Sequence, residues 1–266
     1  MHRPRKRFSQ NFLIDEAVIA AIVEAVHPLQ GERMVEIGPG LGALTLPLTR
    51  RVQPLHVIEI DRDIVARLRE SYASERLVIH EGDALEFDFA ALGPDLRVVG
   101  NLPYHISTPL LFHLGVSAAS TRDIHAMLQS EVVERMVAAP GASDYGRLSV
   151  MLQYHFEIEK VLDVPAEAFR PAPKVESAVV RMIPRNASEL LARDPKLFSA
   201  TVAAAFSQRR KTLRNSLMGL LEVEGIVAAG VDPGARAETL APARFAALAS
   251  QWLARRGDAP RVIPAE

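Results

Sequence analysis

Short apolar runs alternate with amphipathic stretches between residues 31 and 129. This alternation is typical of a doubly wound sheet, in which helices connect neighbouring strands. The connections are short, which favours parallel pairing with right-handed crossovers. The predicted strands are residues 34–37, 55–60, 77–80, 97–99 and 124–128, and the predicted helices are residues 41–48 and 63–72, the second capped by Asp61.

Two later apolar segments, residues 157–164 and 177–183, have no helical pattern between them. Pro165, Pro171 and Pro173 lie there instead, so these segments are expected to form an antiparallel edge of the same sheet. The sequence therefore predicts an α/β fold in residues 1–184, with a Rossmann-like, doubly wound and mostly parallel sheet that has an antiparallel edge.

Beyond residue 184 the hydrophobic pattern is only helical. We therefore expect a small all-helical domain in residues 185–266, joined to the α/β domain near Pro184. The predicted helices are residues 195–207, 208–221, 223–229 and 242–255.

The composition is that of an ordinary folded protein, with 48% hydrophobic and 24% charged residues among 266. The absence of cysteine excludes disulfides, thiolate zinc sites and a cysteine nucleophile, and it favours a reducing compartment. No apolar run is long enough to cross a membrane, and the basic N-terminal residues precede polar ones instead of a signal core. We expect a cytoplasmic protein without a membrane segment, and no metal site, because the histidines lack ligand spacing.

The overall charge of −1 is unevenly distributed. Residues 1–184 carry 19 Lys and Arg against 24 Asp and Glu, a net charge of −5. Residues 185–266 carry 12 against 8, a net charge of +4. Such asymmetry indicates a polyanionic partner for the basic part.

A glycine-rich turn directly follows the first predicted strand, where Glu36 precedes Gly38 and Gly40. Glycines at such a turn let a ligand approach the backbone, and the following helix start offers free N–H donors. Glu59 ends the second strand, near the spacing at which a carboxylate binds ribose hydroxyls. The pattern predicts a nucleoside-containing cofactor but leaves nicotinamide dinucleotides and S-adenosylmethionine both open.

Two further strand ends carry chemistry that a dehydrogenase does not need. Asp83 follows the third strand, and the fourth strand ends in Asn101, Leu102, Pro103 and Tyr104. Adenine N6 is a poor nucleophile, and an Asn oxygen together with a main-chain carbonyl can hold its two hydrogens and orient its lone pair. Tyr104 offers a face for stacking, so methylation of an exocyclic amine is favoured.

Five stretches of the chain resemble one known family. They are residues 5–13 (RKRFSQNFL), 36–42 (EIGPGLG), 101–104 (NLPY), 169–175 (FRPAPKV) and 205–213 (AFSQRRKTL). In this order they closely resemble the bacterial 16S ribosomal RNA adenine N6,N6-dimethyltransferases. The resemblance implies S-adenosylmethionine-dependent dimethylation of two adjacent adenosines near the 3′ end of 16S ribosomal RNA.

The resemblance also implies roles for individual residues. Those implied at the cofactor are Gln10, Asn11 and Leu13 at its methionine end, Gly38 and Gly40 beneath it, Glu59 at the ribose and Asp83 at the adenine. Glu36 and Asn101 are expected at the cofactor for a different reason, because the carboxyl ends of the strands should bring them into one crevice with Glu59 and Asp83. Those implied at the target base are Asn101 and the Leu102 carbonyl at N6, with Tyr104 and Phe169 on the two faces of the ring. One departure is His105, where the family often has Asn, and we expect it to affect only the fine positioning of the substrate.

Two basic clusters are candidates for RNA binding. They are Arg5, Lys6 and Arg7 near the N-terminus and Arg209, Arg210, Lys211 and Arg214 in the helical part. In a helix over residues 208–221, Arg210 and Arg214 would be neighbours on the outer face while Leu213, Leu217 and Leu220 face inward. A solvated tail and the exposed face of a helix are the alternatives.

The expected partner is 16S ribosomal RNA within a small-subunit precursor, bound by a monomer. Three other interpretations remain: a 23S ribosomal RNA adenine methyltransferase, an assembly factor in which binding matters more than methylation, and a nicotinamide dehydrogenase. The match over residues 206–213 argues against the first. Asp83 and the Asn101–Tyr104 motif argue against the third.

Overall fold

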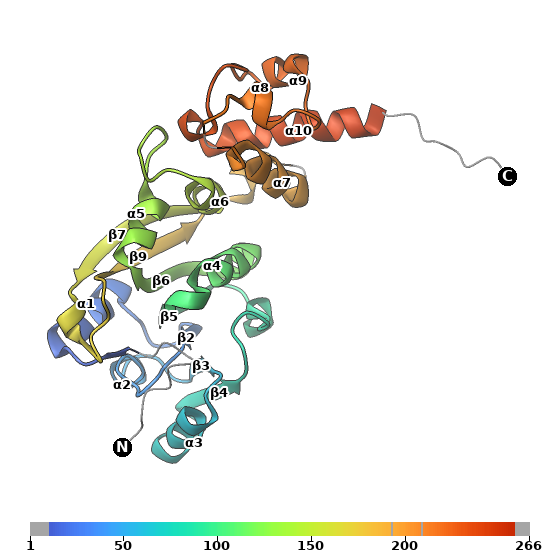
Figure 1. Ribbon diagram of the computed structural model, residues 1–266. Coiled ribbons are helices and arrows are strands. Elements are labelled where there is room, and N and C mark those ends of the chain that lie inside the picture. Colours follow the sequence, from blue (N-terminus) through green and yellow to red (C-terminus); the bar gives the residue numbers. More distant parts are fainter. Residues whose placement is uncertain (1–10, 193, 209, 259–266) are drawn as a thin grey trace. The chain divides into compact units, whose positions relative to one another are not determined.

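The computed structural model describes residues 11–192, 194–208 and 210–258, which form two compact units (Figure 1). The first comprises Met1–Val137 and Phe156–Pro184, and the second comprises Ala138–His155 and Arg185–Glu266. No helix among the described residues is long and apolar enough to cross a membrane.

A seven-stranded sheet forms the centre of the first unit, in the order β4-β3-β2-β5-β6-β9-β7. The strands from β4 to β6 are parallel, whereas β9 is antiparallel to both β6 and β7. This confirms the predicted fold class, including the antiparallel edge. The strands are β2 (Met34–Ile37), β3 (Leu55–Glu59), β4 (Leu77–Glu81), β5 (Leu96–Asn101), β6 (Thr121–Gln129), β7 (Phe156–Val164) and β9 (Ser177–Pro184).

The helices of the first unit include three that the sequence pattern did not reveal, α1, α4 and α5. Helix α1 begins after Asp15, whose carboxylate accepts the N–H groups of Ala17 and Val18. The helix expected over residues 41–48 is shorter, because residues 41–44 form turns in the glycine-rich loop. The helices are α1 (Glu16–Val26), α2 (Thr45–Leu48), α3 (Arg62–Ser71), α4 (Ser107–Val116) and α5 (Ser130–Val137).

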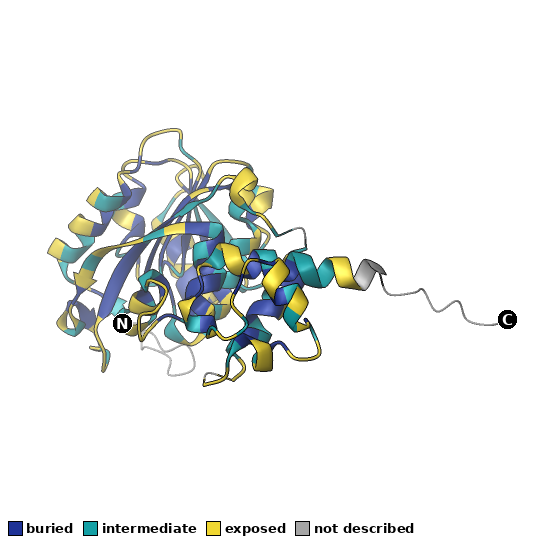
Figure 2. Cartoon of the chain, turned by 90° about the horizontal axis from the view of Figure 1, so that it is seen from above, coloured by how far each residue is buried: buried dark blue, intermediate teal, exposed yellow. Residues whose placement is uncertain are grey.

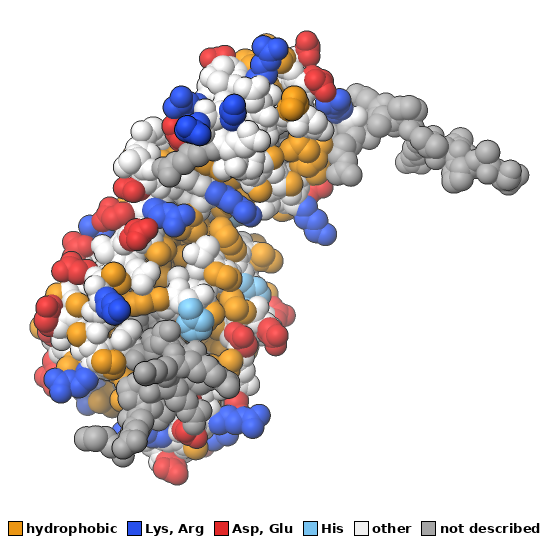
Figure 3. Space-filling view, in the orientation of Figure 1, with side chains coloured by type: hydrophobic (Ala, Val, Ile, Leu, Met, Phe, Trp, Pro, Cys, Tyr) orange, Lys and Arg blue, Asp and Glu red, His pale blue; other side chains and the backbone are white. Residues whose placement is uncertain are grey.

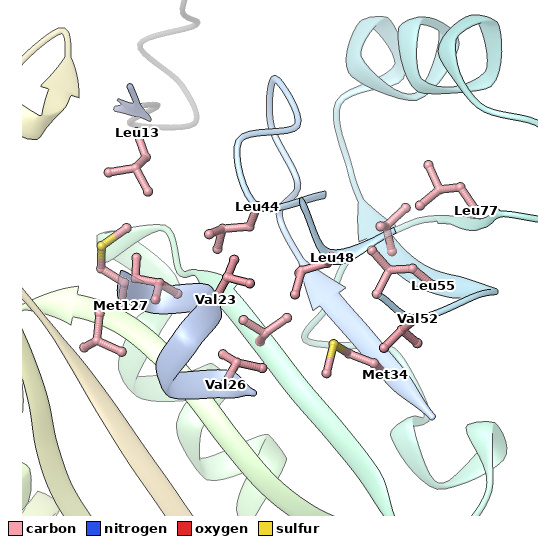
Figure 4. Close-up of a cluster of buried hydrophobic side chains, with 14 of the residues drawn as sticks. Leu13, Val23, Val26, Met34, Leu44, Leu48, Val52, Leu55, Leu77 and Met127 are labelled. Carbon is pink, nitrogen blue, oxygen red and sulfur yellow. The ribbon is translucent and has the colours of Figure 1, made fainter. Parts of the chain in front are cut away.

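The two faces of the sheet are covered by different segments. Side chains alternate between the faces along each strand, so Met34, Leu55 and Met127 share one face and pack with Val23 and Val26 of α1 (Figure 4). The opposite face carries a row of contacting rings, which are His56, His80, Phe87, Phe89 and His113 of α4. Buried residues accordingly concentrate in the strands (Figure 2).

A two-stranded sheet ties the start of the described chain to the segment before β9. Strand β1 (Phe12–Leu13) pairs antiparallel with β8 (Phe169–Arg170). The Ile14 N–H also donates to the Ala168 carbonyl at 2.8 Å. These bonds fix Asn11, which directly precedes β1.

The helical unit differs from the expected one by an added segment. Residues 138–155, assigned above to the first domain, pack with the helices after Pro184. The Tyr145 hydroxyl donates to the Leu240 carbonyl at 2.7 Å, and Tyr154 stacks on Phe198. These contacts with the later helices account for the difference. The helices are α6 (Arg147–His155), α7 (Pro195–Phe206), α8 (Leu213–Ser216), α9 (Val223–Ala228) and α10 (Pro242–Asp258).

The helix predicted over residues 208–221 is wrong. Among the described residues of this stretch only α8 forms, and Arg210 lies before it, so Arg210 and Arg214 are not neighbours on one helix. The N–H groups of Leu213 and Arg214 donate to the Ala235 and Pro233 carbonyls, and these bonds replace those to a preceding turn. Leu213 and Leu217 are buried as expected.

Short 3₁₀ helices complete both units. They are η2 (Phe89–Leu92), η3 (Tyr104–Ile106), η4 (Ala118–Ser120), η5 (Ala166–Ala168), η6 (Ala187–Glu189) and η7 (Ala237–Thr239). Of these, η3 follows β5 and carries the aromatic residue of the Asn101–Tyr104 motif. This position places Tyr104 at the carboxyl end of a central strand of the sheet.

A buried ion network holds the amino-terminal ends of β5 and β6 together. The Arg97 guanidinium donates from Nη2 to Asp123 Oδ2 at 2.8 Å and from Nη1 to Glu32 Oε2 at 2.7 Å. It also donates to the Val26 carbonyl at the end of α1. Arg97 and Asp123 are each only 7% exposed in their side chains. These buried charges are therefore stable in the interior only while they are paired with one another.

We expect Asp123→Ala to lower the free energy of unfolding by up to about 3–5 kcal/mol, because the buried Arg97 charge would lose the more buried of its two carboxylate partners and keep only Glu32. Arg122→Ala is the matched control, since Arg122 binds Glu32 from an exposed position and should contribute less than about 1 kcal/mol. Urea unfolding followed by circular dichroism measures both. Equal losses in the two variants would contradict the assignment.

Candidate active site

A cavity of about 360 Å³ lies at the carboxyl edge of β2, β3, β4 and β5. This volume is within the range of small-molecule sites, and the edge is where open α/β sheets bind ligands. The cavity is lined by nearly all the described residues that the sequence pointed to. They are Asn11, Leu13, Glu36, Gly38, Gly40, Glu59, Asp83, Asn101, Leu102 and Tyr104.

The glycine-rich turn needs its glycines for conformational reasons. Gly38 and Gly40 have φ values of 66° and 53°, in the left-handed region that side chains disfavour. The Gly38 N–H donates to the Ile58 carbonyl of β3, which fixes the turn against the neighbouring strand. The cavity floor is therefore main chain that is held in place against β3.

Glu36 is buried under this turn and is only 2% exposed. Its Oε2 accepts the Thr45 hydroxyl at 2.6 Å. Burial raises the pKa of Glu36 to about 8, and the nearby Glu59 charge adds to this while the Thr45 hydrogen bond opposes it. The carboxyl group is consequently mostly neutral at pH 7 in the ligand-free protein.

Two further carboxylates line the cavity at the ends of β3 and β4. Glu59 accepts the Asp61 N–H at 2.8 Å, and burial raises its pKa although main-chain donors including Gly40 oppose the shift. Asp83 accepts the Leu85 N–H through Oδ1 at 2.9 Å. Each carboxylate is thus fixed by main-chain donors at the cavity wall.

The orientation of the Asn101 amide follows from its contact with the chain start. Its Nδ2 donates to the main-chain carbonyl of Asn11 at 3.3 Å. A carbonyl only accepts hydrogen bonds, so this contact identifies the nitrogen and leaves Oδ1 on the other side. Within the part of the chain that the structure describes, Oδ1 accepts no hydrogen bond.

The next residues add a second acceptor and an aromatic ring. The Leu102 N–H donates to the Met127 carbonyl of β6 at 3.1 Å, while its own carbonyl accepts nothing among the described residues. Tyr104 is half-buried, lines the cavity, and has its hydroxyl 2.7 Å from Ser177 Oγ. Two acceptors and one ring therefore meet at one end of the cavity.

Phe169 does not lie where the resemblance placed it. Its side chain is 3% exposed, packs in the core with Leu13 and Val179, and does not line the cavity. Pairing of β8 with β1 accounts for this position. In this conformation only Tyr104 of the two expected rings is available to a base in the cavity.

The basic clusters are only partly described. Arg5, Lys6, Arg7, Gln10 and Arg209 lie outside the described residues. Arg210, Lys211 and Arg214 are exposed, and no carboxylate of the described chain pairs with any of them. Lys and Arg side chains are visible on the surface of the second unit in Figure 3.

Three residues with a place at the site were missed or undervalued in the sequence. Thr45 donates a hydrogen bond to Glu36, and nothing in the sequence indicated this contact between residues nine positions apart. Asp61 is 1% exposed and supplies an N–H to Glu59, beyond its expected role as a helix cap. His105 is exposed but lines the cavity beside Tyr104.

Comparison with known proteins gives the family. The ribosomal RNA adenine dimethylase family matches residues 1–253. The chain belongs to this family.

Curated relatives of this dimethylase are similar over almost its whole length. It is 61% identical to the ribosomal RNA small subunit methyltransferase A of Thiobacillus denitrificans, covering 96% of this chain and all of that one. It is 59% identical to the protein of the same name from Aromatoleum aromaticum, covering 98% of each. The family expected from the five motifs is thereby confirmed.

Solved structures of related enzymes share the fold of the dimethylase. A dimethyladenosine transferase from Plasmodium falciparum superimposes with a TM-score of 0.74 at 26% identity, covering 89% of this chain and 95% of that one. The 23S ribosomal RNA methyltransferase ErmE superimposes with a TM-score of 0.68 at 27% identity, covering 91% and 99%.

We expect Glu36→Gln to stabilise the ligand-free dimethylase increasingly as the pH rises from about 6 to about 8. The pKa of Glu36 is raised in the folded state, so its contribution to the free energy of unfolding is full below the ordinary pKa of a Glu carboxyl group. This contribution is lost as the pH rises toward about 8, whereas Gln cannot ionise and loses nothing. The difference can grow by at most about 1.4 kcal/mol per pH unit.

Thermal unfolding across this pH range measures the effect. The other titratable groups that face Glu36 are Glu59 and Tyr72. Glu70→Gln on the exposed face of α3 is the control and should give a constant difference. Parallel stability curves for wild type and Glu36→Gln would disprove the raised pKa.

Proposed function

We propose that this dimethylase transfers methyl groups from S-adenosylmethionine to N6 of two adjacent adenosines near the 3′ end of 16S ribosomal RNA. The observation that carries the proposal is the pair of acceptors, Asn101 Oδ1 and the Leu102 carbonyl, at one end of a nucleoside-sized cavity. Two hydrogens of an exocyclic amine require two such acceptors.

The cavity suits S-adenosylmethionine on its own chemistry. Carboxylates end β3 and β4, where Glu59 can take the ribose hydroxyls and Asp83 the adenine amine. The buried carboxyl of Glu36 lies under the main-chain turn at Gly38 and Gly40, and Asn11 and Leu13 border the same space. Bound there, S-adenosylmethionine supplies an electrophilic methyl group on sulfur.

The chain's own contribution to the reaction is orientation. Asn101 and the Leu102 carbonyl accept the two N6 hydrogens, which turns the nitrogen lone pair away from the adenine ring and toward the cofactor space. Tyr104 supports the face of the base. After transfer the methylated nitrogen is acidic, and its proton leaves to solvent or to one of the same acceptors.

The choice of small-subunit RNA rests on similarity. Identity is 61% and 59% to proteins named for the small subunit but 27% to ErmE, whose name specifies 23S ribosomal RNA. The 23S alternative is therefore less favoured. We further propose that a monomer acts on a small-subunit precursor in the bacterial cytoplasm, and contributes to small-subunit assembly by binding it.

The helical unit is proposed to bind the RNA. Segment 138–155 contains one basic residue, Arg147, and one acidic residue, Asp144, so its transfer leaves the net charges at −5 and +4. The exposed cations Arg210, Lys211 and Arg214 supply part of this excess. Phosphates favour such a surface over the acidic first unit.

Asn101→Ala should lower methyl transfer about 10²–10³-fold, because one acceptor that orients the amine is lost. Its affinity for S-adenosylmethionine should change far less, although the bond to the Asn11 carbonyl is also lost. Primer extension across the two adenosines, on small subunits from a strain lacking the protein, measures transfer, and calorimetry measures cofactor binding.

The control for Asn101→Ala is Asn186→Ala, an exposed residue at η6 that should retain full transfer. Wild-type protein that leaves both adenosines unmodified would overturn the proposed function. Near wild-type transfer by Asn101→Ala would instead leave the function intact and reject the orienting role.

Replacing Arg210, Lys211 and Arg214 together by Ala should weaken RNA binding and leave S-adenosylmethionine affinity unchanged. Each lost phosphate contact reduces the slope of log K against log salt by about 0.7–0.9. The matched control replaces Arg185, Arg236 and Arg255, which lie beside Glu189, Glu238 and Glu222. A wild-type slope in the first triple variant, measured by filter binding, would place the RNA on another surface.

A further inference from the structure

Ser177 lies outside every motif considered so far, yet it contacts the aromatic residue of the site. Its Oγ is 2.7 Å from the Tyr104 hydroxyl, and either oxygen can donate. Ser177 is 0% exposed, whereas Tyr104 is half-buried and lines the cavity. The hydrogen bond thus joins a fully buried group to a residue at the ligand surface.

The topology explains why these residues meet. Strand β9 runs antiparallel to β6, so its first residue, Ser177, lies at the edge where the parallel strands end. It pairs with Gln129 of β6 and Val164 of β7, and is therefore held between two strands. The Asn101–Tyr104 motif leaves β5 at this same edge.

The main chain on both sides of the hydrogen bond is fixed. The Ser130 N–H donates to the Glu176 carbonyl at 2.9 Å, next to Ser177. The Leu102 N–H donates to the Met127 carbonyl at 3.1 Å, two residues before Tyr104. Because Leu102 is anchored on β6 and Glu176 on Ser130 directly after β6, the hydroxyl contact fixes where the far end of the Tyr104 ring lies.

From this geometry we infer that Ser177 is a positioning residue, which holds the Tyr104 ring in the place needed to support the target adenine. The inference rests on the proposed function. Phe169 is buried in the core, so the base depends on the Tyr104 face more than the family resemblance implies. Without the hydroxyl partner the ring can swing about the Cα–Cβ bond, and the amine loses its alignment with the Asn101 and Leu102 acceptors.

A cycle of Ser177→Ala, Tyr104→Phe and the double variant tests the role. Each single variant removes the same hydrogen bond and keeps the ring, so each should lower kcat about tenfold, since small misplacements of reacting groups are costly. The KM for S-adenosylmethionine should stay at the wild-type value. The double variant should lose no more than either single one, because the same bond is already absent.

Thr121→Ala is the matched control. Thr121 is also a buried hydroxyl on this sheet, donates to the Ser117 carbonyl, and begins β6 at the opposite edge. Its loss should lower the melting temperature without changing kcat. Melting temperatures and calorimetric cofactor binding of all variants show whether each is folded.

The outcomes separate this inference from the proposed function. A wild-type protein that does not methylate the RNA overturns both. If wild type is active, a wild-type kcat for Ser177→Ala overturns the role of Ser177 alone. The same holds if the two losses multiply to about a hundredfold in the double variant, because Ser177 would then act independently of the Tyr104 hydroxyl.

Discussion

The close parallel packing of β2 against β5 is the constraint on which the site depends. A Cβ on Gly100 would lie 2.5 Å from the Ile37 carbonyl, so only glycine permits this approach. It places the end of β5, with Asn101, directly beside the turn that follows β2. The glycine turn and the acceptor motif are far apart in sequence, and this contact makes them one site.

The polar side chains of the site are oriented mainly by hydrogen bonds to main-chain groups, and less by other charged side chains. Asn101 owes its orientation to the Asn11 carbonyl, and Glu59 and Asp83 are fixed by main-chain N–H groups. The pKa of Glu36 is raised by burial, so its carboxyl group adds little negative charge at pH 7. Main-chain groups keep their geometry when no ligand is bound, which suits a reaction that depends on alignment.

The sequence was sufficient to predict those parts of the fold and of the site that follow from a local pattern of residues. The strands and the residues at their carboxyl ends could be predicted, because parallel strands bring those ends to one edge. The position of Phe169 could not, because pairing of β8 with β1 is a contact between distant segments. The prediction of a helix over residues 208–221 was wrong for a similar reason. The carbonyls of Pro233 and Ala235 accept the main-chain N–H groups that a longer helix would use. Ser177 carried no signal, because its importance comes only from the register of β9.

The cofactor binding and the RNA binding that we propose make opposite electrostatic demands, and we assign them to different units of the chain. The carboxyl groups that suit a cationic, nucleoside-containing cofactor belong to a unit of net charge −5, which disfavours a phosphate chain. A surface of unpaired cations belongs to the other unit, whose net charge is +4. Because salt screens exposed charges far more than buried ones, RNA capture should respond strongly to ionic strength while the aligned acceptors at Asn101 and Leu102 do not. Affinity for the substrate and orientation of the reacting amine can therefore vary independently in this protein.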